Sequence, residues 1–183
     1  MKKIMIDMDD VITEGGFLHL INSYLKTDYK QEDFSEYYMQ DIVPNKEEFF
    51  RYFLENNQYD YCNLKKDAKE VLKELNMYYE IYITTSYLIK EVPNECGIIL
   101  LQKFNYLKKE LPFINPYQYI FTSNKSIINT DIKIDDKISN LENAKRKLLF
   151  TAYHNKNIKN KYLEENNIER VDEWKDVKKL LKK

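Results

Sequence analysis

The stretch Lys3-Ile4-Met5-Ile6-Asp7-Met8-Asp9-Asp10, near the start of the chain, decides the fold. Its apolar run is typical of a strand that is buried on both faces of a parallel sheet, and the run ends in carboxylates. Carboxylates this close together repel one another unless a cation neutralises them, and a hard divalent ion takes such oxygen ligands. The stretch therefore predicts a parallel strand whose carboxyl end carries a metal site.

Further along the chain, short apolar segments predict more strands of the same sheet. They cover residues 79–84, 117–122, 131–135 and 147–152. Helical patterns lie between or after them, over residues 98–111, 138–146 and 172–183. Strands that alternate with helices favour an α/β fold, in which helices cover both faces of a parallel sheet in a Rossmann-like three-layer arrangement.

Residues 12–77 interrupt this alternation, because they contain several helical patterns and no convincing strand. The clearest helices are predicted over 45–54, after a capping Asn45, and over 64–75. The segment is rich in aromatic residues, most of which we expect to pack against the sheet domain and a few to face a ligand. We therefore expect a helical cap over residues 12–77, and a core formed by residues 1–11 and 78–183.

The composition excludes several classes of function. Among 183 residues, 29 Lys and Arg balance 30 Asp and Glu, so no positive field favours a nucleic acid polymer or a membrane as partner. Only 3 glycines are present, which excludes a glycine-rich dinucleotide fingerprint and a Walker loop. Acidic residues interrupt the first apolar run too early for a signal peptide or a membrane span. Two distant cysteines are typical of a reduced, cytoplasmic protein.

Polar groups follow the other predicted strands at the same edge of the sheet. The pair Asp135-Asp136 ends one strand and Thr84-Thr85-Ser86 ends another, while Lys125 follows a third. In parallel sheets, ligands bind at the carboxyl ends of the strands. Hydroxyl groups and a lysine suit phosphate oxygens, so the set predicts a site where a phosphoryl group is held beside a cation.

These residues resemble a known family. Asp7-Met8-Asp9-Asp10-Val11, Ile83-Thr84-Thr85-Ser86, Lys125 and Ile134-Asp135-Asp136 follow the order of the four motifs of the haloacid dehalogenase (HAD)-like phosphatases. A helical insert after the first motif is similar to the small C1-type cap of that family. Within the HAD-like family, the chain is similar to the 5'(3')-deoxyribonucleotidases, or cytosolic type C 5'-nucleotidases. The similarity lies in Gly15-Gly16-Phe17 and in the Thr-Ser and Ile-Asp-Asp motifs.

The resemblance implies a mechanism. Asp7 is expected to attack phosphorus and form an aspartyl-phosphate. Asp9 is expected to protonate the departing alkoxide and then to deprotonate the water that hydrolyses the intermediate, which requires a raised pKa at Asp9. Mg²⁺ is the expected cofactor, held by Asp7, by Asp9 through its carbonyl, and by Asp135 or Asp136, with Asp135 the first choice. Asp10 stands where many members of the family have glycine.

The resemblance also implies a substrate. Thr85, Ser86 and Lys125 are expected to hold the phosphate, and Lys125 to stabilise charge in the transition state. Phe17 is the cap residue expected to contact the base or sugar. The enzyme is thus expected to be a hydrolase of phosphoric monoesters, acting on a nucleoside monophosphate and most specifically on deoxyribonucleotides. Neither His19 nor His154 is assigned a role.

Two other functions remain open from the residues. One is a phosphatase of the same kind that acts on another small monoester, such as a sugar phosphate. The other is a phospho-acceptor signalling domain of the receiver type, which also gathers acids, a hydroxyl and a lysine around Mg²⁺. Receivers place their acidic pair first and the phosphorylated Asp on a later strand, an order that differs from the one found here.

Overall fold

The computed structural model describes residues 1–182, and its centre is a six-stranded sheet in the order β5-β4-β1-β6-β7-β8. Every neighbouring pair in this sheet is parallel. The strands are β1 (Lys2–Asp7), β4 (Tyr79–Thr85), β5 (Tyr119–Phe121), β6 (Thr130–Asp135), β7 (Ala144–Phe150) and β8 (Ile168–Val171). The parallel α/β fold expected from the sequence is confirmed.

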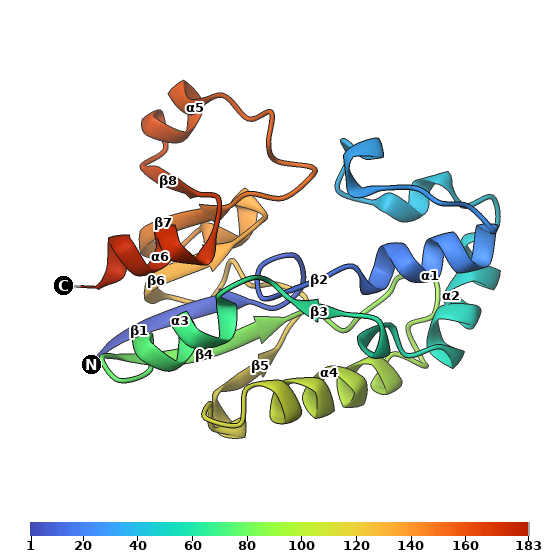
Figure 1. Ribbon diagram of the computed structural model, residues 1–183, viewed down its shortest axis with the longest axis horizontal. Coiled ribbons are helices and arrows are strands. Elements are labelled where there is room, and N and C mark those ends of the chain that lie inside the picture. Colours follow the sequence, from blue (N-terminus) through green and yellow to red (C-terminus); the bar gives the residue numbers. More distant parts are fainter. Residues whose placement is uncertain (183) are drawn as a thin grey trace.

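Six α-helices accompany the sheet in the described part of the chain. They are α1 (Gly16–Leu25), α2 (Lys46–Glu55), α3 (Ala68–Leu75), α4 (Gly97–Glu110), α5 (Asn160–Glu165) and α6 (Trp174–Leu181). Short 3-10 helices are η1 (Gln31–Asp33), η2 (Met39–Ile42), η3 (Gln58–Asp60), η4 (Pro116–Gln118) and η5 (Ile138–Leu141). In Figure 1, α1 and α2 lie beyond the end toward which β1 and β4 point, opposite both chain termini. None of these helices combines the length and the apolar character that crossing a bilayer requires.

Of the three apolar clusters in the described part of the chain, the two larger ones form most of the core. The larger joins the sheet strands to the buried faces of α3 and α6, and Trp174 within it donates a hydrogen bond of 2.9 Å to the carbonyl of Val11. The smaller joins α1 and α2 and includes Phe49, Phe50 and Phe53. Helix α4 contributes to both, because its first turn packs in the smaller cluster and its last turns in the larger. The helix therefore ties the layer above the sheet to the sheet itself.

The entry into α1 depends on two glycines. Gly15 has φ +91°, in the region that side chains disfavour. A Cβ at Gly16 would collide with the Cys62 sulfur and with the carbonyl of Gln58. The pair Gly15-Gly16 is therefore required for the close packing of α1 against η3.

Several sequence predictions need correction. The helix predicted over 138–146 is wrong: only η5 forms there, since Asn143 adopts a left-handed φ of +62° and the chain then enters β7. Strand β8 was not predicted. Residues 12–77 contain a short antiparallel ladder, β2 (Thr13–Glu14) with β3 (Asn63–Leu64), where no strand was expected. Helix α3 lies in that range although its buried residues belong to the larger cluster, and the boundary between cap and core stays a prediction.

Candidate active site

A tight turn after β1 presents the first acidic group. Asp7 is the last residue of the strand, and its Oδ1 accepts a hydrogen bond of 2.6 Å from the amide of Met8. The chain then reverses, because the amides of Ile12 and Thr13 both donate to the carbonyl of Met8. Asp10 occupies the left-handed position of this turn with φ +58°. Asp tolerates that conformation better than most residues, which explains how the turn accommodates an aspartate at this position.

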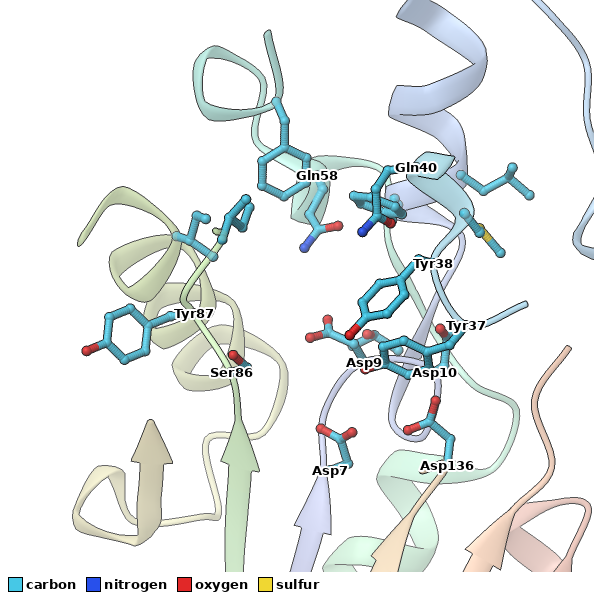
Figure 2. A pocket seen from close by; sticks show the side chains of 18 of the residues that line it. Asp7, Asp9, Asp10, Tyr37, Tyr38, Gln40, Gln58, Ser86, Tyr87 and Asp136 are labelled. Atoms are coloured by element: carbon cyan, nitrogen blue, oxygen red, sulfur yellow. The ribbon is translucent and has the colours of Figure 1, made fainter. Parts of the chain in front are cut away.

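The sheet brings the predicted site residues to one edge. Asp7 is in register with Thr84, and the preceding residue of β1 is in register with Ile134, so the ends of β1, β4 and β6 meet. Figure 2 shows Asp7 and Asp136 beside each other at the strand ends, with Ser86 just past the end of the neighbouring strand β4. The juxtaposition expected from the sequence is therefore present.

Three buried carboxylates form a group that suits a cation. Asp7, Asp135 and Asp136 each offer an oxygen, and these oxygens lie within 4.8 Å of one another. Burial and the charge of Asp135 raise the pKa of Asp7 to about 7. Burial and the charge of Asp7 raise the pKa of Asp136 well above its ordinary value. Full ionisation of the three carboxylates is therefore disfavoured unless more positive charge is placed beside them.

Lys125 supplies part of the compensating charge. Its Nζ lies 2.5 Å from Oδ1 of Asp7 and 3.1 Å from Oδ2 of Asp135. Burial opposes its charge, but Asp7 and Asp135 raise the pKa of Lys125 above its ordinary value. A buried, charged lysine beside the acidic group is the arrangement that the sequence predicted for this residue.

The two acids at the end of β6 differ in how their oxygens are used. Both oxygens of Asp135 are engaged: Oδ2 by Lys125, and Oδ1 by the amide of Lys137 and the side-chain nitrogen of Asn140, each at 2.9 Å. The carboxylate of Asp136 makes a single hydrogen bond within residues 1–182, between its Oδ2 and Nε2 of His154 at 2.7 Å. Its second oxygen is free to bind a ligand, and Asp136 also lines the cavity that Asp135 does not reach.

The donor set fits Mg²⁺. Oxygen ligands are what this ion prefers, and it commonly takes only one or two carboxylates from the protein. In the described part of the chain, Oδ2 of Asp7 and Oδ1 of Asp136 have no protein donor. A divalent cation would bind these two free oxygens and neutralise carboxylates whose ionised form is otherwise disfavoured.

Asp9 is held by a separate set of donors. The hydroxyl of Tyr59 donates to its Oδ1 at 2.8 Å, and the hydroxyl of Thr85 to its Oδ2 at 3.3 Å. Lys103 forms an ion pair with Asp9 and also donates to Thr85 at 2.5 Å. Burial would raise the pKa of Asp9, but the charge and hydrogen bond of Lys103 outweigh burial and lower it. The raised pKa expected from the sequence is wrong, because Lys103 was not foreseen as a partner.

A cavity of about 680 Å³ opens over these groups. Asp7, Asp9, Ser86, Lys125 and Asp136 form part of its wall, and Phe17 lines it from α1. Thr85 is buried beneath the wall with its hydroxyl turned to Asp9. The structure thus brings the predicted residues together. Thr85 and Asp135 do not line the cavity and instead bind other side chains of the site, Thr85 binding Asp9 and Asp135 binding Lys125.

Aromatic and amide side chains enclose the cavity from the cap. Figure 2 shows Tyr37, Tyr38, Gln40 and Gln58 around the space beyond the carboxylates. Tyr38 keeps 52% of its surface exposed although it lines the cavity. Phe17 is less free, because its ring packs edge-on against two phenylalanines of α2 at 5.7 and 5.9 Å.

Tyr37 connects this layer to the sheet domain. Its carbonyl accepts a hydrogen bond of 2.7 Å from the hydroxyl of Tyr153, and its ring lies 4.9 Å from that of His154. The ammonium of Lys137 lies 4.3 Å from the centre of the same ring, within cation–π range. The segment that carries Tyr37 and Tyr38 is therefore fastened next to the acidic group.

Sequence reasoning missed Lys103, Tyr59 and His154 as members of the site. Lys103 had a detectable signal: it falls on the helical face of Ile99, Tyr106 and Leu107, where a charged residue requires a buried partner. Tyr59 and His154 gave no comparable signal, since each reaches the site through loops whose course no local pattern defines. Burial and the charge of Lys137 lower the pKa of His154 to about 4, so a neutral ring is hydrogen-bonded to Asp136.

Comparisons with known proteins show which family the chain belongs to. The family model described as "5' nucleotidase, deoxy (Pyrimidine), cytosolic type C protein" matches residues 1–183. The 5'(3')-deoxyribonucleotidase of Bacillus subtilis is 31% identical over 185 residues, covering 99% of both chains. A relative from Staphylococcus epidermidis is 32% identical over 181 residues, covering 97% of this chain and 94% of its own. A haloacid dehalogenase-like family hydrolase from Streptococcus pneumoniae shares the fold, with a TM-score of 0.55 at 14% identity and 98% coverage of both chains.

Proposed function

The chain belongs to the cytosolic type C family of 5'-nucleotidases and is a hydrolase of phosphoric monoesters, and from that premise we propose that it dephosphorylates deoxyribonucleoside monophosphates with the help of Mg²⁺. The observation that carries the proposal is the convergence of Asp7, Asp9, Lys125 and Asp136 on the wall of one cavity. The cavity is large enough for a small ligand. A cytoplasmic setting stays a prediction.

Asp7 is the proposed nucleophile. Its carboxylate oxygen attacks phosphorus, the ester bond to the nucleoside breaks, and an aspartyl-phosphate forms, which divides one difficult displacement into two easier ones. Asp9 gives its proton to the departing alkoxide and takes one from the water that later releases inorganic phosphate. Because the pKa of Asp9 is lowered, its carboxylate must take up a proton before it can act as an acid. The negative charge of a dianionic phosphate beside it raises the pKa of Asp9 and so favours that protonation.

Asp136 is the proposed side-chain ligand of the metal, together with Asp7 and the carbonyl of Asp9. The sequence favoured Asp135 instead, but both of its oxygens are engaged by protein donors, whereas Asp136 keeps one free. The bond from His154 orients Asp136, as residues behind metal ligands commonly do. Bound Mg²⁺ would supply positive charge that neutralises the acidic group and the phosphate.

Lys125 and Ser86 are the proposed contacts of the phosphoryl oxygens. Both line the cavity, and Lys125 already touches Asp7 at the position where phosphorus must approach. Charge that shifts to these oxygens in the transition state is stabilised by a fixed ammonium group. Thr85 is proposed to act by orienting Asp9 and Lys103, through the hydrogen bonds that its hydroxyl makes.

The exposed ring of Tyr38 is the proposed platform for the base, with Phe17 beside the sugar. Stacking on an aromatic ring is open to any base, so this arrangement supports a nucleotide more than a sugar phosphate. A phosphatase for another small monoester would need the same acidic group at the edge of the sheet, but it would not need the exposed ring of Tyr38.

The test is phosphate release from deoxyribo- and ribonucleoside 5'- and 3'-monophosphates and from sugar phosphates, each with Mg²⁺ and each with the Asp7→Asn variant as control. Preference for deoxyribonucleotides, lost in the variant and lost with EDTA, is the expected result. Turnover of sugar phosphates alone would overturn the substrate, and equal turnover by the variant would overturn the role of Asp7.

A further inference from the structure

Lys133 is a buried lysine that plays no part in the chemistry above. It lies in the middle of β6 between two isoleucines, and its side chain has no exposed surface. Its Nζ donates three hydrogen bonds, all to backbone carbonyls: to Lys125 at 2.8 Å, to Asn140 at 3.1 Å and to Glu142 at 2.6 Å. Packing alone does not explain why a buried apolar strand contains a lysine at this position.

The number of acceptors defines the state of this lysine. A protonated ammonium has three N–H groups and a neutral amine has two, so three carbonyl acceptors match the charged form. A buried charge is costly unless its hydrogen bonds are satisfied, and here each N–H has a partner. Lys133 therefore provides an internal cation that is coordinated by carbonyl oxygens.

The carbonyls belong to two segments that both reach the acidic group. One segment carries Lys125, whose side chain pairs with Asp7 and Asp135. The other begins at Lys137 and carries Asn140, whose side chain donates to Asp135 at 2.9 Å. Lys133 thus binds the backbone of the same two residues, Lys125 and Asn140, whose side chains bind Asp135.

Asp135 itself stands two residues after Lys133 on the same strand. Residues two apart point to the same face of a strand, so the ammonium and the carboxylate lie on one side of β6. The two segments are therefore linked twice. Lys133 binds their backbone carbonyls, and Asp135 binds the side chains of Lys125 and Asn140.

We propose that Lys133 is a positioning residue for the phosphatase reaction, which sets the place of Lys125 and, through Asn140 and Asp135, the place of Asp136. This inference rests on the proposed function, since it concerns the efficiency of that reaction. A displacement of about 1 Å in such groups costs on the order of a hundredfold in rate, so loss of the ammonium is expected to act on turnover.

The test compares two substitutions with a matched control. Lys133→Met keeps the length of the side chain and removes its charge and donors. Lys133→Ala opens a space of the size of propylammonium, lined by the three carbonyls. Lys147→Met is the control, because Lys147 is the in-register neighbour of Lys133 on β7, and within residues 1–182 it forms no ion pair with the acidic group.

For Lys133→Met we expect kcat to fall about 10- to 100-fold, with little change in KM, in a protein that still unfolds cooperatively. For Lys133→Ala we expect added propylammonium to restore part of kcat, and propanol of the same shape to restore none. Wild-type kcat in folded Lys133→Met, or equal rescue by propanol, would overturn the proposal. A variant with lowered thermal stability but unchanged kcat would also overturn it, since the lysine would then be structural alone.

A readout without substrate separates this inference from the proposed function. Amide hydrogen exchange in Lys133→Met is expected to rise in residues 123–128 and 137–142 and to stay at the wild-type level in β1. If the wild-type protein hydrolyses no monoester while exchange rises as expected, the proposed function fails, and what stands is that Lys133 fixes the two segments beside the acidic group. Unchanged exchange in both segments would overturn the positioning role whatever the activity.

Discussion

The edge of the sheet and the cap above it reach the same cavity by different means. At the edge, most acids and lysines are buried and held by specific partners, as Asp7 is by Lys125. Asp9, whose side chain is 43% exposed, pairs with the buried Lys103. In the cap, the aromatic rings pack chiefly on one another, and Tyr38 faces the cavity with half of its surface exposed. Charges that are fixed before the substrate arrives suit catalysis, whereas an exposed ring suits recognition.

This contrast indicates which part of the molecule tolerates substitution. Removing a partner from a buried charge leaves the charge uncompensated, so a substitution at the edge disturbs several groups together. An exposed ring in the cap has few partners, so its loss affects the ligand alone. The comparison leads us to expect large effects on rate at the edge and smaller effects on substrate choice in the cap.

Asp7→Asn gives the largest expected effect. The change removes the nucleophile but keeps the size of the side chain, so we expect kcat to fall by roughly 10⁴-fold or more, as for other catalytic nucleophiles. Phosphate release measures the rate, and circular dichroism checks that the fold is retained. Turnover within tenfold of wild type would remove Asp7 from the chemistry and weaken the contrast between edge and cap.

Asp9→Asn tests the second acid. Loss of general acid–base catalysis is expected to lower kcat about 10²- to 10⁴-fold for a nucleotide, which has a poor leaving group. A substrate whose leaving group needs no proton is expected to lose less. Tyr59→Phe is the matched control, because it removes only one of the donors to Asp9. An equal loss for both kinds of substrate would contradict the role of Asp9 as acid.

Tyr38→Ala tests the cap. Loss of one stacking contact, worth about 1–3 kcal/mol, is expected to lower kcat/KM for a deoxyribonucleotide by roughly 5- to 100-fold. Glycerol phosphate, which has no base, is expected to be hydrolysed as by the wild type, and Tyr38→Phe is expected to retain nucleotide preference. A parallel fall for both substrates would mean that the ring supports the edge and does not recognise the base.

Stability in Mg²⁺ as a function of pH gives the smallest expected effect. The pKa of Asp7 is raised from 3.8 to about 7, so the stability linked to its protonated form is present below about pH 4 and is lost as pH rises to 7. A cation that neutralises the carboxylate compensates for this loss. The gain in Tm on adding Mg²⁺ is therefore expected to grow between pH 5 and pH 7.

The control for this measurement is Asp136→Asn, which removes the proposed side-chain ligand that faces the cavity. Its gain in Tm with Mg²⁺ is expected to be small at every pH. A gain in wild-type protein that stays constant or falls with rising pH would contradict the competition between proton and metal at the acidic group.

The edge could be predicted from the sequence because its residues follow directly after strands. An apolar run that ends in acid fixes the place of Asp7, and parallel topology then brings Asp136, Ser86 and Lys125 beside it. The partners of Asp9 could not be predicted in the same way. Lys103 lies on a helix and Tyr59 in a 3-10 turn, and only tertiary packing brings them to the acid.

The cap was less predictable for a related physical reason. Its aromatic residues were evident in the sequence, but a ring that packs in a cluster and a ring that faces a ligand have the same local pattern. Phe17 was expected to contact the substrate and does line the cavity, although its ring also packs on α2. Tyr38, the more exposed ring, was not singled out, because its exposure depends on the course of the loop before η2.

The most direct measurement is the mass of the peptide that contains Asp7, taken after acid quench during turnover of a deoxyribonucleoside monophosphate. We expect the mass of one added phosphoryl group on Asp7 while substrate remains, and its disappearance once the substrate is consumed. The group should be absent in Asp7→Asn. A peptide that is never modified during turnover, or one that stays phosphorylated after the substrate is exhausted as in a phospho-acceptor domain, would contradict hydrolysis through an aspartyl-phosphate at the sheet edge.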